Sequence, residues 1–70
     1  MPYLTNGELP DSVRTHLPEH AQDIFRETFN NAWQEYGGDE ARAFRVAWAA
    51  VEKQYRKDAQ GRWVRTTHPA

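Results

Sequence analysis

Large aromatic side chains recur at helical spacing on both sides of a Gly37–Gly38 pair. At about 100° per residue, the residues before this pair form one apolar stripe, about 140° wide, on a predicted helix from Pro18 to about Tyr36. The stripe contains Ala21, Phe25, Thr28, Phe29, Ala32, Trp33 and Tyr36, with Ile24 at its edge. Glycine adopts the left-handed conformation that ends many helices without a Cβ penalty, so we expect this helix to end at the glycine pair.

A further helix is predicted after the glycines, with Asp39 as its N-cap and an end near Lys57. Its main apolar stripe is about 120° wide, and Val46 and Ala50 form a second patch on the far side. The main stripe contains Ala41, Phe44, Ala47, Trp48, Val51 and Tyr55. A helix that is apolar on two sides is usually covered on both, so we expect the preceding helix to cover one side and the terminal segments to cover the other.

A short first helix and a small β element complete the prediction. Pro10 suits the first position of a helix, and Pro18 disfavours helical geometry just before it, so the helix between them must be short. Residues 62–65 alternate like a brief strand, and we expect them to pair with the extended segment 2–8 and to place Trp63 against the third helix. The expected fold is therefore mainly α, a compact three-helix domain with a short two-stranded β element from the chain termini.

The size of the chain permits one domain, which we assign to residues 1–70. A second domain would need ~100 residues or more of its own. Leu, Ile, Val and Phe together supply 11 of the 70 residues, a shortage that nine aromatic residues offset because each can bury ~150–250 Å². The net charge of −1 also argues against a disordered chain.

The absence of cysteine bears on location. It excludes disulfides and thiolate metal sites and favours a reducing compartment. No apolar run approaches the ~18 residues that span a bilayer, and the first residues do not resemble a signal peptide. We therefore expect a cytoplasmic protein without direct membrane insertion.

Charge is divided unevenly along the sequence. Residues 1–40 carry two arginines against eight carboxylates, a net −6, whereas residues 41–70 carry seven cations against two carboxylates, a net +5. The second helix presents a candidate protein-binding surface, the acidic strip, which consists of Glu19, Asp23 and Glu27. The third helix presents a candidate anion-binding surface, the basic ridge, which consists of Arg42, Arg45, Lys53 and Arg56. The alternative for both is an ordinary solvated helix face.

The sequence lacks a recognisable reactive cluster. His16 and His20 are four residues apart, but Pro18 interrupts the helix between them, so the spacing does not align two imidazoles for a metal. Ser12 is the single serine and lies in no nucleophile elbow. We expect Asp23 and Glu27 to point away from the aromatic stripe of the second helix and to stay solvated, unlike an acid and base pair. We expect no enzymatic activity, no catalytic residue, no metal site and no cofactor.

Several segments of the chain resemble the ChaB family of small bacterial proteins. They are Leu9–Val13, Leu17–Phe25, Phe29–Tyr36 and Val46–Val51, followed by Tyr55 and Trp63. The resemblance extends roughly from Pro2 to Val64 and implies a compact helical domain with a small two-stranded element. The family is named for a gene beside that of a sodium/proton and calcium/proton antiporter, and it is described as a regulator of cation transport. The connection between the second and third helices, longer and charge-rich in some members, here shortens to about Gly37–Glu40.

Two hypotheses of function result. The first is a non-enzymatic cytoplasmic accessory protein that contacts another protein, which the resemblance implies is a membrane cation (sodium or calcium)/proton antiporter. Cytoplasmic loops of membrane proteins are rich in Lys and Arg, so the acidic strip would be the docking surface. The alternative is a small nucleic-acid-binding protein that uses the basic ridge, although a pI near 6.3 is low for such a domain.

Overall fold

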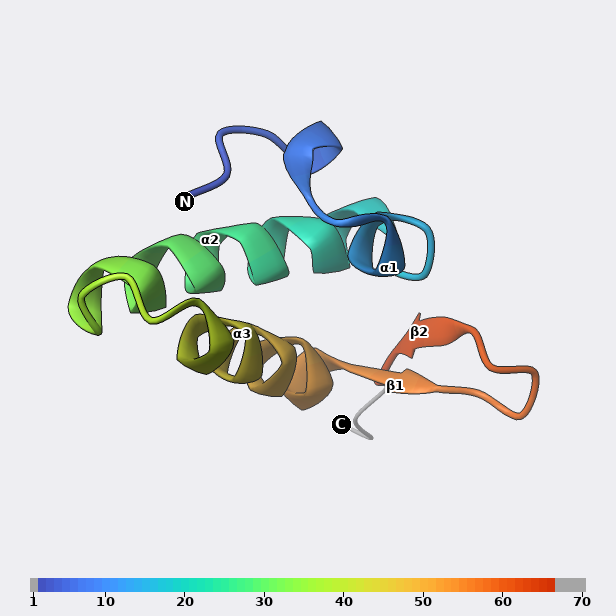
Figure 1. The fold of residues 1–70 in the computed structure, drawn as a ribbon. Coiled ribbons are helices and arrows are strands. Elements are labelled where there is room, and N and C mark those ends of the chain that lie inside the picture. Colours follow the sequence, from blue (N-terminus) through green and yellow to red (C-terminus); the bar gives the residue numbers. More distant parts are fainter. Residues whose placement is uncertain (1, 67–70) are drawn as a thin grey trace.

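Helices α2 (Glu19–Glu35) and α3 (Glu40–Gln54) lie side by side and run in opposite directions in the computed structural model (Figure 1). The short helices η1 (Asn6–Glu8) and α1 (Asp11–Arg14) precede them, and strands β1 (Tyr55–Lys57) and β2 (Trp63–Arg65) follow. The structure describes residues 2–66, so Met1 and residues 67–70 of the predicted domain lie outside the described residues. The predicted architecture of three α-helices and a small two-stranded sheet is confirmed.

Aromatic rings fill the core between α2 and α3. Phe25 and Phe29 of α2 are fully buried. The ring centre of Phe25 lies 5.2 Å from that of Trp48, and the ring centre of Phe29 lies 5.0 Å from that of Phe44. Both contacts are close to edge-to-face, the arrangement that the quadrupoles of aromatic rings favour. The predicted stripe of α2 is therefore confirmed, except that Tyr36 at its end is exposed.

The apolar residues of α3 form one broad arc. Ala43, Ala47 and Val51 are buried, and Phe44, Val46, Trp48 and Ala50 are half-buried. At about 100° per residue this arc spans about 200° of the helix. Ala43, which the sequence analysis left out, joins the two predicted patches, whereas Ala41, which was placed in the main stripe, is exposed. The prediction for Ala41 was wrong because its position lies just beyond the edge of the arc.

The turn between α2 and α3 depends on glycine. Gly37 and Gly38 have φ angles of 65° and 87°, and the Gly38 N–H donates to the carbonyl oxygen of Trp33 at 2.8 Å. The Asp39 carboxylate then accepts from the Arg42 N–H at 3.1 Å. The predicted end of α2 and the predicted N-cap of α3 are both confirmed. These caps fix where the two aromatic faces meet.

The strand pairing differs from the prediction. Strand β2 pairs with β1, in antiparallel register with Lys57 opposite Trp63, so the predicted pairing with residues 2–8 was wrong. Helix α3 accordingly ends at Gln54 and does not reach Lys57. A turn over residues 58–61 closes the hairpin, and so short a loop costs less entropy than bringing the two ends of the chain together. The predicted contact of Trp63 with α3 is confirmed, since its ring centre lies 5.7 Å from that of Trp48.

The N-terminal segment packs on α2 through side chains. The Asn30 side chain accepts from the Tyr3 N–H and donates to the Tyr3 carbonyl, both at 2.8 Å. The Tyr3 ring lies 4.9 Å from that of Phe29, and burial, with a smaller effect from the Glu40 carboxylate, raises the pKa of its hydroxyl. One asparagine therefore replaces the strand that the sequence analysis expected to hold this segment.

Candidate functional site

The acidic strip on α2 is interrupted at Asp23, which binds the N-terminal segment. Glu19 and Glu27 are exposed, but the Asp23 carboxylate accepts from the Asn6 side chain at 2.6 Å. Arg26 lies beside it, with its Nη2 atom 3.9 Å from Asp23 Oδ1 and its Nε donating to Asn6 Oδ1 at 2.8 Å. The middle of the strip is thus partly neutralised and has a structural role. Glu19 and Glu27 are the two members whose side chains remain available.

The basic ridge is shorter than predicted. Arg42, Arg45 and Lys53 are exposed on α3, and the Arg42 guanidinium lies 4.0 Å from the centre of the Tyr36 ring, which orients it by a cation–π contact. Arg56 belongs to β1 and not to α3, so its predicted place on the ridge was wrong. The helix ends before Arg56 because residues 55–57 pair with β2. Three of the four predicted residues share the helix face.

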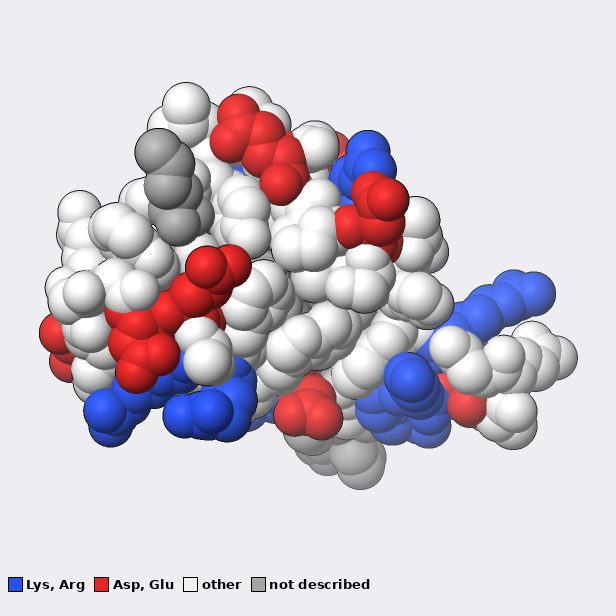
Figure 2. Space-filling view, viewed as in Figure 1, with Lys and Arg blue, Asp and Glu red and all other residues white. Residues whose placement is uncertain are grey.

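The two charge classes gather in different parts of the surface. Figure 2 shows most Lys and Arg side chains of this face along the lower edge formed by α3 and the hairpin, with some Asp and Glu beside them, whereas the upper part over the N-terminal elements is mainly acidic with one basic group. Among residues 2–66, the ion pairs are Arg14 with Asp11 and Arg26 with Asp23, both in the acidic half. The charge asymmetry of the sequence therefore persists in the folded surface, and both ion pairs use the arginines of the acidic half.

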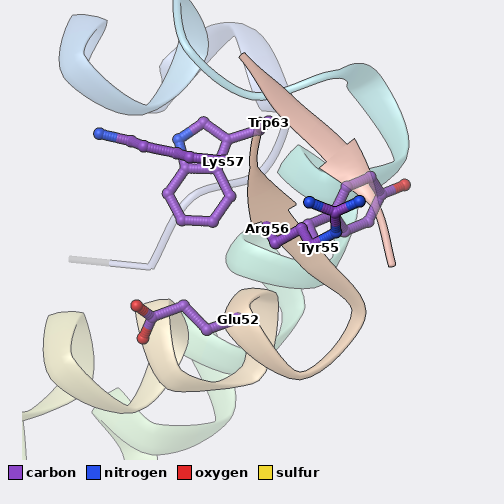
Figure 3. A pocket seen from close by; sticks show the side chains of 5 residues that line it. All are labelled: Glu52, Tyr55, Arg56, Lys57 and Trp63. Carbon is purple, nitrogen blue, oxygen red and sulfur yellow. The ribbon is translucent and has the colours of Figure 1, made fainter. Parts of the chain in front are cut away.

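A pocket that the sequence analysis missed lies between the end of α3 and the hairpin (Figure 3). It has a volume of about 490 Å³ and is lined by Glu52, Tyr55, Arg56, Lys57 and Trp63. Residues from a helix end and from two strands meet here because β1 pairs with β2. A pattern of charged residues around 52–57 was visible in the sequence, but its relation to Trp63 required the correct strand partner.

The hairpin turn beside this pocket depends on one carboxylate. Asp58 Oδ1 accepts from the backbone N–H groups of Gln60 and Arg62, each at 2.9 Å. The hydrogen bond from Arg62, followed by that from Gln60, holds the pKa of the Asp58 carboxyl below its ordinary value. A carboxyl with a depressed pKa in the folded state stabilises that state above its unfolded pKa of about 3.9 and loses this effect as the pH falls through its folded pKa.

We therefore expect the turn to loosen below about pH 4. The amide resonances of Gln60 and Arg62, followed by NMR from about pH 6 to pH 2, should move as Asp58 is protonated. Asp58→Asn is the matched control, since its side-chain oxygen still accepts hydrogen bonds but does not titrate. Equal movement of the two amides in the wild type and in this variant would contradict the assignment to Asp58.

Within residues 2–66, no group of three or more His, Asp or Glu side chains is arranged to hold a metal ion. The Nδ1 atom of His16 lies 2.8 Å from the Ser12 carbonyl oxygen, and the His20 ring lies 6.3 Å from the ring of Tyr55. In the same part of the chain, no helix combines the length and apolar character needed to span a membrane.

A family model and the relatives found by sequence comparison point to the same family. A family model described as ChaB matches residues 9–66. Proteins named "Putative cation transport regulator ChaB" from Escherichia coli (strain K12) and from Shigella flexneri are each 46% identical to this chain over 72 aligned positions. The alignments cover 90% of this chain and 95% of each relative.

A solved structure is similar throughout. An NMR solution structure of a protein with the same name superposes with a TM-score of 0.83 at 41% sequence identity. The match covers 94% of this chain and 100% of the solved chain. The helices and the hairpin that position the two charged surfaces are therefore shared with an experimentally determined fold.

Proposed function

The chain belongs to the ChaB family, and on this basis we propose that it is a non-enzymatic, cytoplasmic accessory protein that regulates cation transport by binding another protein. The partner that we propose is the cytoplasmic face of a membrane cation/proton antiporter. The names of the relatives support the regulatory role. The choice of surface rests on the charges of this chain.

The observation that carries the proposal is the exposure of Glu19 and Glu27 on α2. Cytoplasmic loops of membrane proteins are enriched in Lys and Arg, so they are electrostatically complementary to these two carboxylates. Asp23 contributes less directly, because its carboxylate already binds Asn6. The proposed docking surface is therefore the two outer members of the acidic strip, held in place by α2.

Ion pairs between exposed side chains are weak and sensitive to salt. Each such pair contributes about 0.2–1 kcal/mol and is screened by salt beyond a Debye length of about 10 Å at 0.1 M. Charge complementarity of this kind mainly sets the association rate and the choice of partner. We expect a weak, fast and salt-sensitive complex, as suits a regulator that must dissociate.

The test uses the 70-residue chain and synthetic peptides that match the cytoplasmic loops of a cation/proton antiporter from the same cell. Glu27→Lys and Glu19→Lys are each expected to weaken binding about three- to tenfold at about 50 mM salt, because one attraction becomes a repulsion. The effect should largely disappear at about 0.5 M salt. Isothermal titration or NMR titration gives the affinities.

Glu35→Lys is the matched control. Glu35 is an exposed residue of the same helix, but it lies outside the strip, about 160° around the helix from Glu19 and about 80° beyond Glu27. Its charge reversal should leave peptide affinity nearly unchanged. Equal losses for Glu35→Lys and Glu27→Lys would show that only net charge matters, and undiminished binding by Glu27→Lys would exclude the acidic strip as the docking surface.

The geometry of the basic ridge does not favour the alternative of nucleic-acid binding. The four-residue ridge is incomplete on α3, because Arg56 lies on β1, and Arg42 is engaged with Tyr36. Neither observation favours phosphate binding over protein docking. Two cations of the basic half, Arg56 and Lys57, line the pocket beside the hairpin.

A further inference from the structure

The pocket at the hairpin has one apolar wall and a mixed polar rim. Figure 3 shows Lys57 lying along the Trp63 indole on one side of the pocket, and Glu52 extending from the last turn of α3 on the other. Its volume of about 490 Å³ falls within the range of about 300–1,000 Å³ that is usual for binding pockets. It is thus large enough to receive one or two side chains of a partner.

The apolar wall is held in a fixed position. The Trp63 ring packs against Trp48, with ring centres 5.7 Å apart, and it remains half-buried, so part of the indole stays accessible. The Lys57 ammonium lies 5.7 Å from the centre of the same ring. Tryptophan beside a cation is a frequent anchor in protein interfaces, since its large ring loses little entropy on binding.

The net charge around the pocket is positive, because its cations outnumber Glu52. Arg56 and Lys57 line it, and Arg62 and Arg65 of the same hairpin are exposed. Asp58, the carboxylate within the hairpin, accepts hydrogen bonds from backbone N–H groups of the turn. Among the described residues from Arg42 onward, no cation lies within ion-pair distance of a carboxylate. These cations are therefore available to a partner of opposite charge.

We infer that this pocket docks an acidic peptide segment of a partner protein, with an apolar side chain of that segment placed against Trp63. Carboxylates of the segment would bind Arg56 and Lys57, whereas Glu52 would accept a backbone N–H of the peptide. Glu52 repels any anion, but the backbone of a peptide offers it an N–H donor and a chain of phosphates does not, so the mixed rim favours a peptide over a phosphate backbone. The pocket shares no residue with the acidic strip, so this inference goes beyond the proposed function and either can fail alone.

The test is an NMR titration of the ¹⁵N-labelled 70-residue chain with a capped peptide of sequence EDFED. The Trp63 indole resonance, assigned by its absence from Trp63→Phe, and the backbone amides of Arg56 and Lys57 are expected to shift. A capped peptide of sequence KKFKK, free phosphate and a single-stranded oligonucleotide are titrated in parallel. The acidic peptide should bind at least tenfold more tightly than the basic one at about 50 mM salt.

Matched variants identify the pocket. Arg56→Gln and Lys57→Gln are each expected to weaken binding of EDFED about three- to tenfold, whereas Arg45→Gln, an exposed cation of α3 outside the pocket, should change it less than twofold. Glu52→Gln should tighten binding about two- to threefold, because it removes a repulsion and keeps an acceptor. This rise in affinity is expected for any anionic ligand, whereas the basic peptide KKFKK should bind Glu52→Gln more weakly than the wild type.

Four results would overturn the inference. They are the absence of a shift at Trp63 with EDFED, equal losses for Arg45→Gln and Lys57→Gln, a phosphate response as strong as that to the peptide, and tighter binding of the oligonucleotide. The third would indicate a small-anion site and the fourth a nucleic-acid surface. Variants of Glu19 and Glu27 should not change the response to EDFED, so the outcome is independent of the acidic strip.

Discussion

Replacing Phe25 by alanine is expected to cost about 3–5 kcal/mol of folding stability. The Phe25 side chain is fully buried, and its ring contacts those of Phe29, Phe44 and Trp48 at centroid distances between 5.2 and 6.3 Å. Truncation removes both the buried apolar surface and the aromatic contacts between α2 and α3. A domain of this length has a total stability of about 3.5–10 kcal/mol, so the variant should lose about a third or more of its free energy of unfolding.

Urea denaturation followed by circular dichroism measures this effect. Leu4→Ala is the control, because Leu4 is 80% exposed and its truncation should change stability by less than about 0.5 kcal/mol. Phe25→Leu keeps most of the apolar volume and should lie between the two variants. A cost below about 1 kcal/mol for Phe25→Ala would contradict a core held together by these rings.

Enlarging Ala47 to leucine is expected to cost about 1–3 kcal/mol. Ala47 is fully buried in the centre of the arc that α3 turns toward the core, where small side chains allow the helices to approach closely. A larger side chain there would push the helices apart or force neighbouring rings out of their rotamers.

Ala49→Leu provides a control with the same chemical change. Ala49 lies on the exposed face of the same helix, so its substitution should alter the midpoint of thermal unfolding by little. Both variants replace one alanine of α3 by leucine, so they change helix propensity equally. The difference between their unfolding midpoints therefore measures the effect of packing alone. Equal midpoints would mean that Ala47 does not lie in a close-packed interface.

The helices were predictable from the sequence because their signals are local. The aromatic stripe of α2, the glycine pair after it and the Asp39 N-cap each depend on residues within a few positions of one another. Periodicity of this kind survives in any helix that buries one face. The arc of α3 was harder, because Ala43 lies between its two apolar patches and was assigned to neither of them.

The strand pairing was not predictable in the same way. Residues 55–57 continue the helical pattern of α3, and only their pairing with 63–65 shows that the helix ends earlier. Tertiary pairing overrides local propensity in such segments. The N-terminal segment could equally have paired as a strand, but the Asn30 side chain already satisfies the backbone of Tyr3.

The charge of the candidate sites was predictable from the sequence, but the placement of their side chains was predictable only in part. The sequence identified the acidic strip and the basic half, and the structure adds that Asn6 and Arg26 bind Asp23 and that Arg56 belongs to the hairpin. The pocket depends on Glu52 and Trp63, which are eleven positions apart and meet only through the turn at 58–61. A charge pattern shows which ligands suit a surface, but the chain path determines where they bind.

We propose two docking surfaces of opposite charge on this one small domain. One NMR chemical-shift map of the ¹⁵N-labelled chain, recorded with a basic antiporter loop peptide and then with the acidic peptide EDFED, tests this directly. We expect the basic peptide to shift the amides around Glu19 and Glu27, and the acidic peptide to shift those around Lys57 and Trp63. Both peptides shifting the same residues, or neither shifting any, would contradict it.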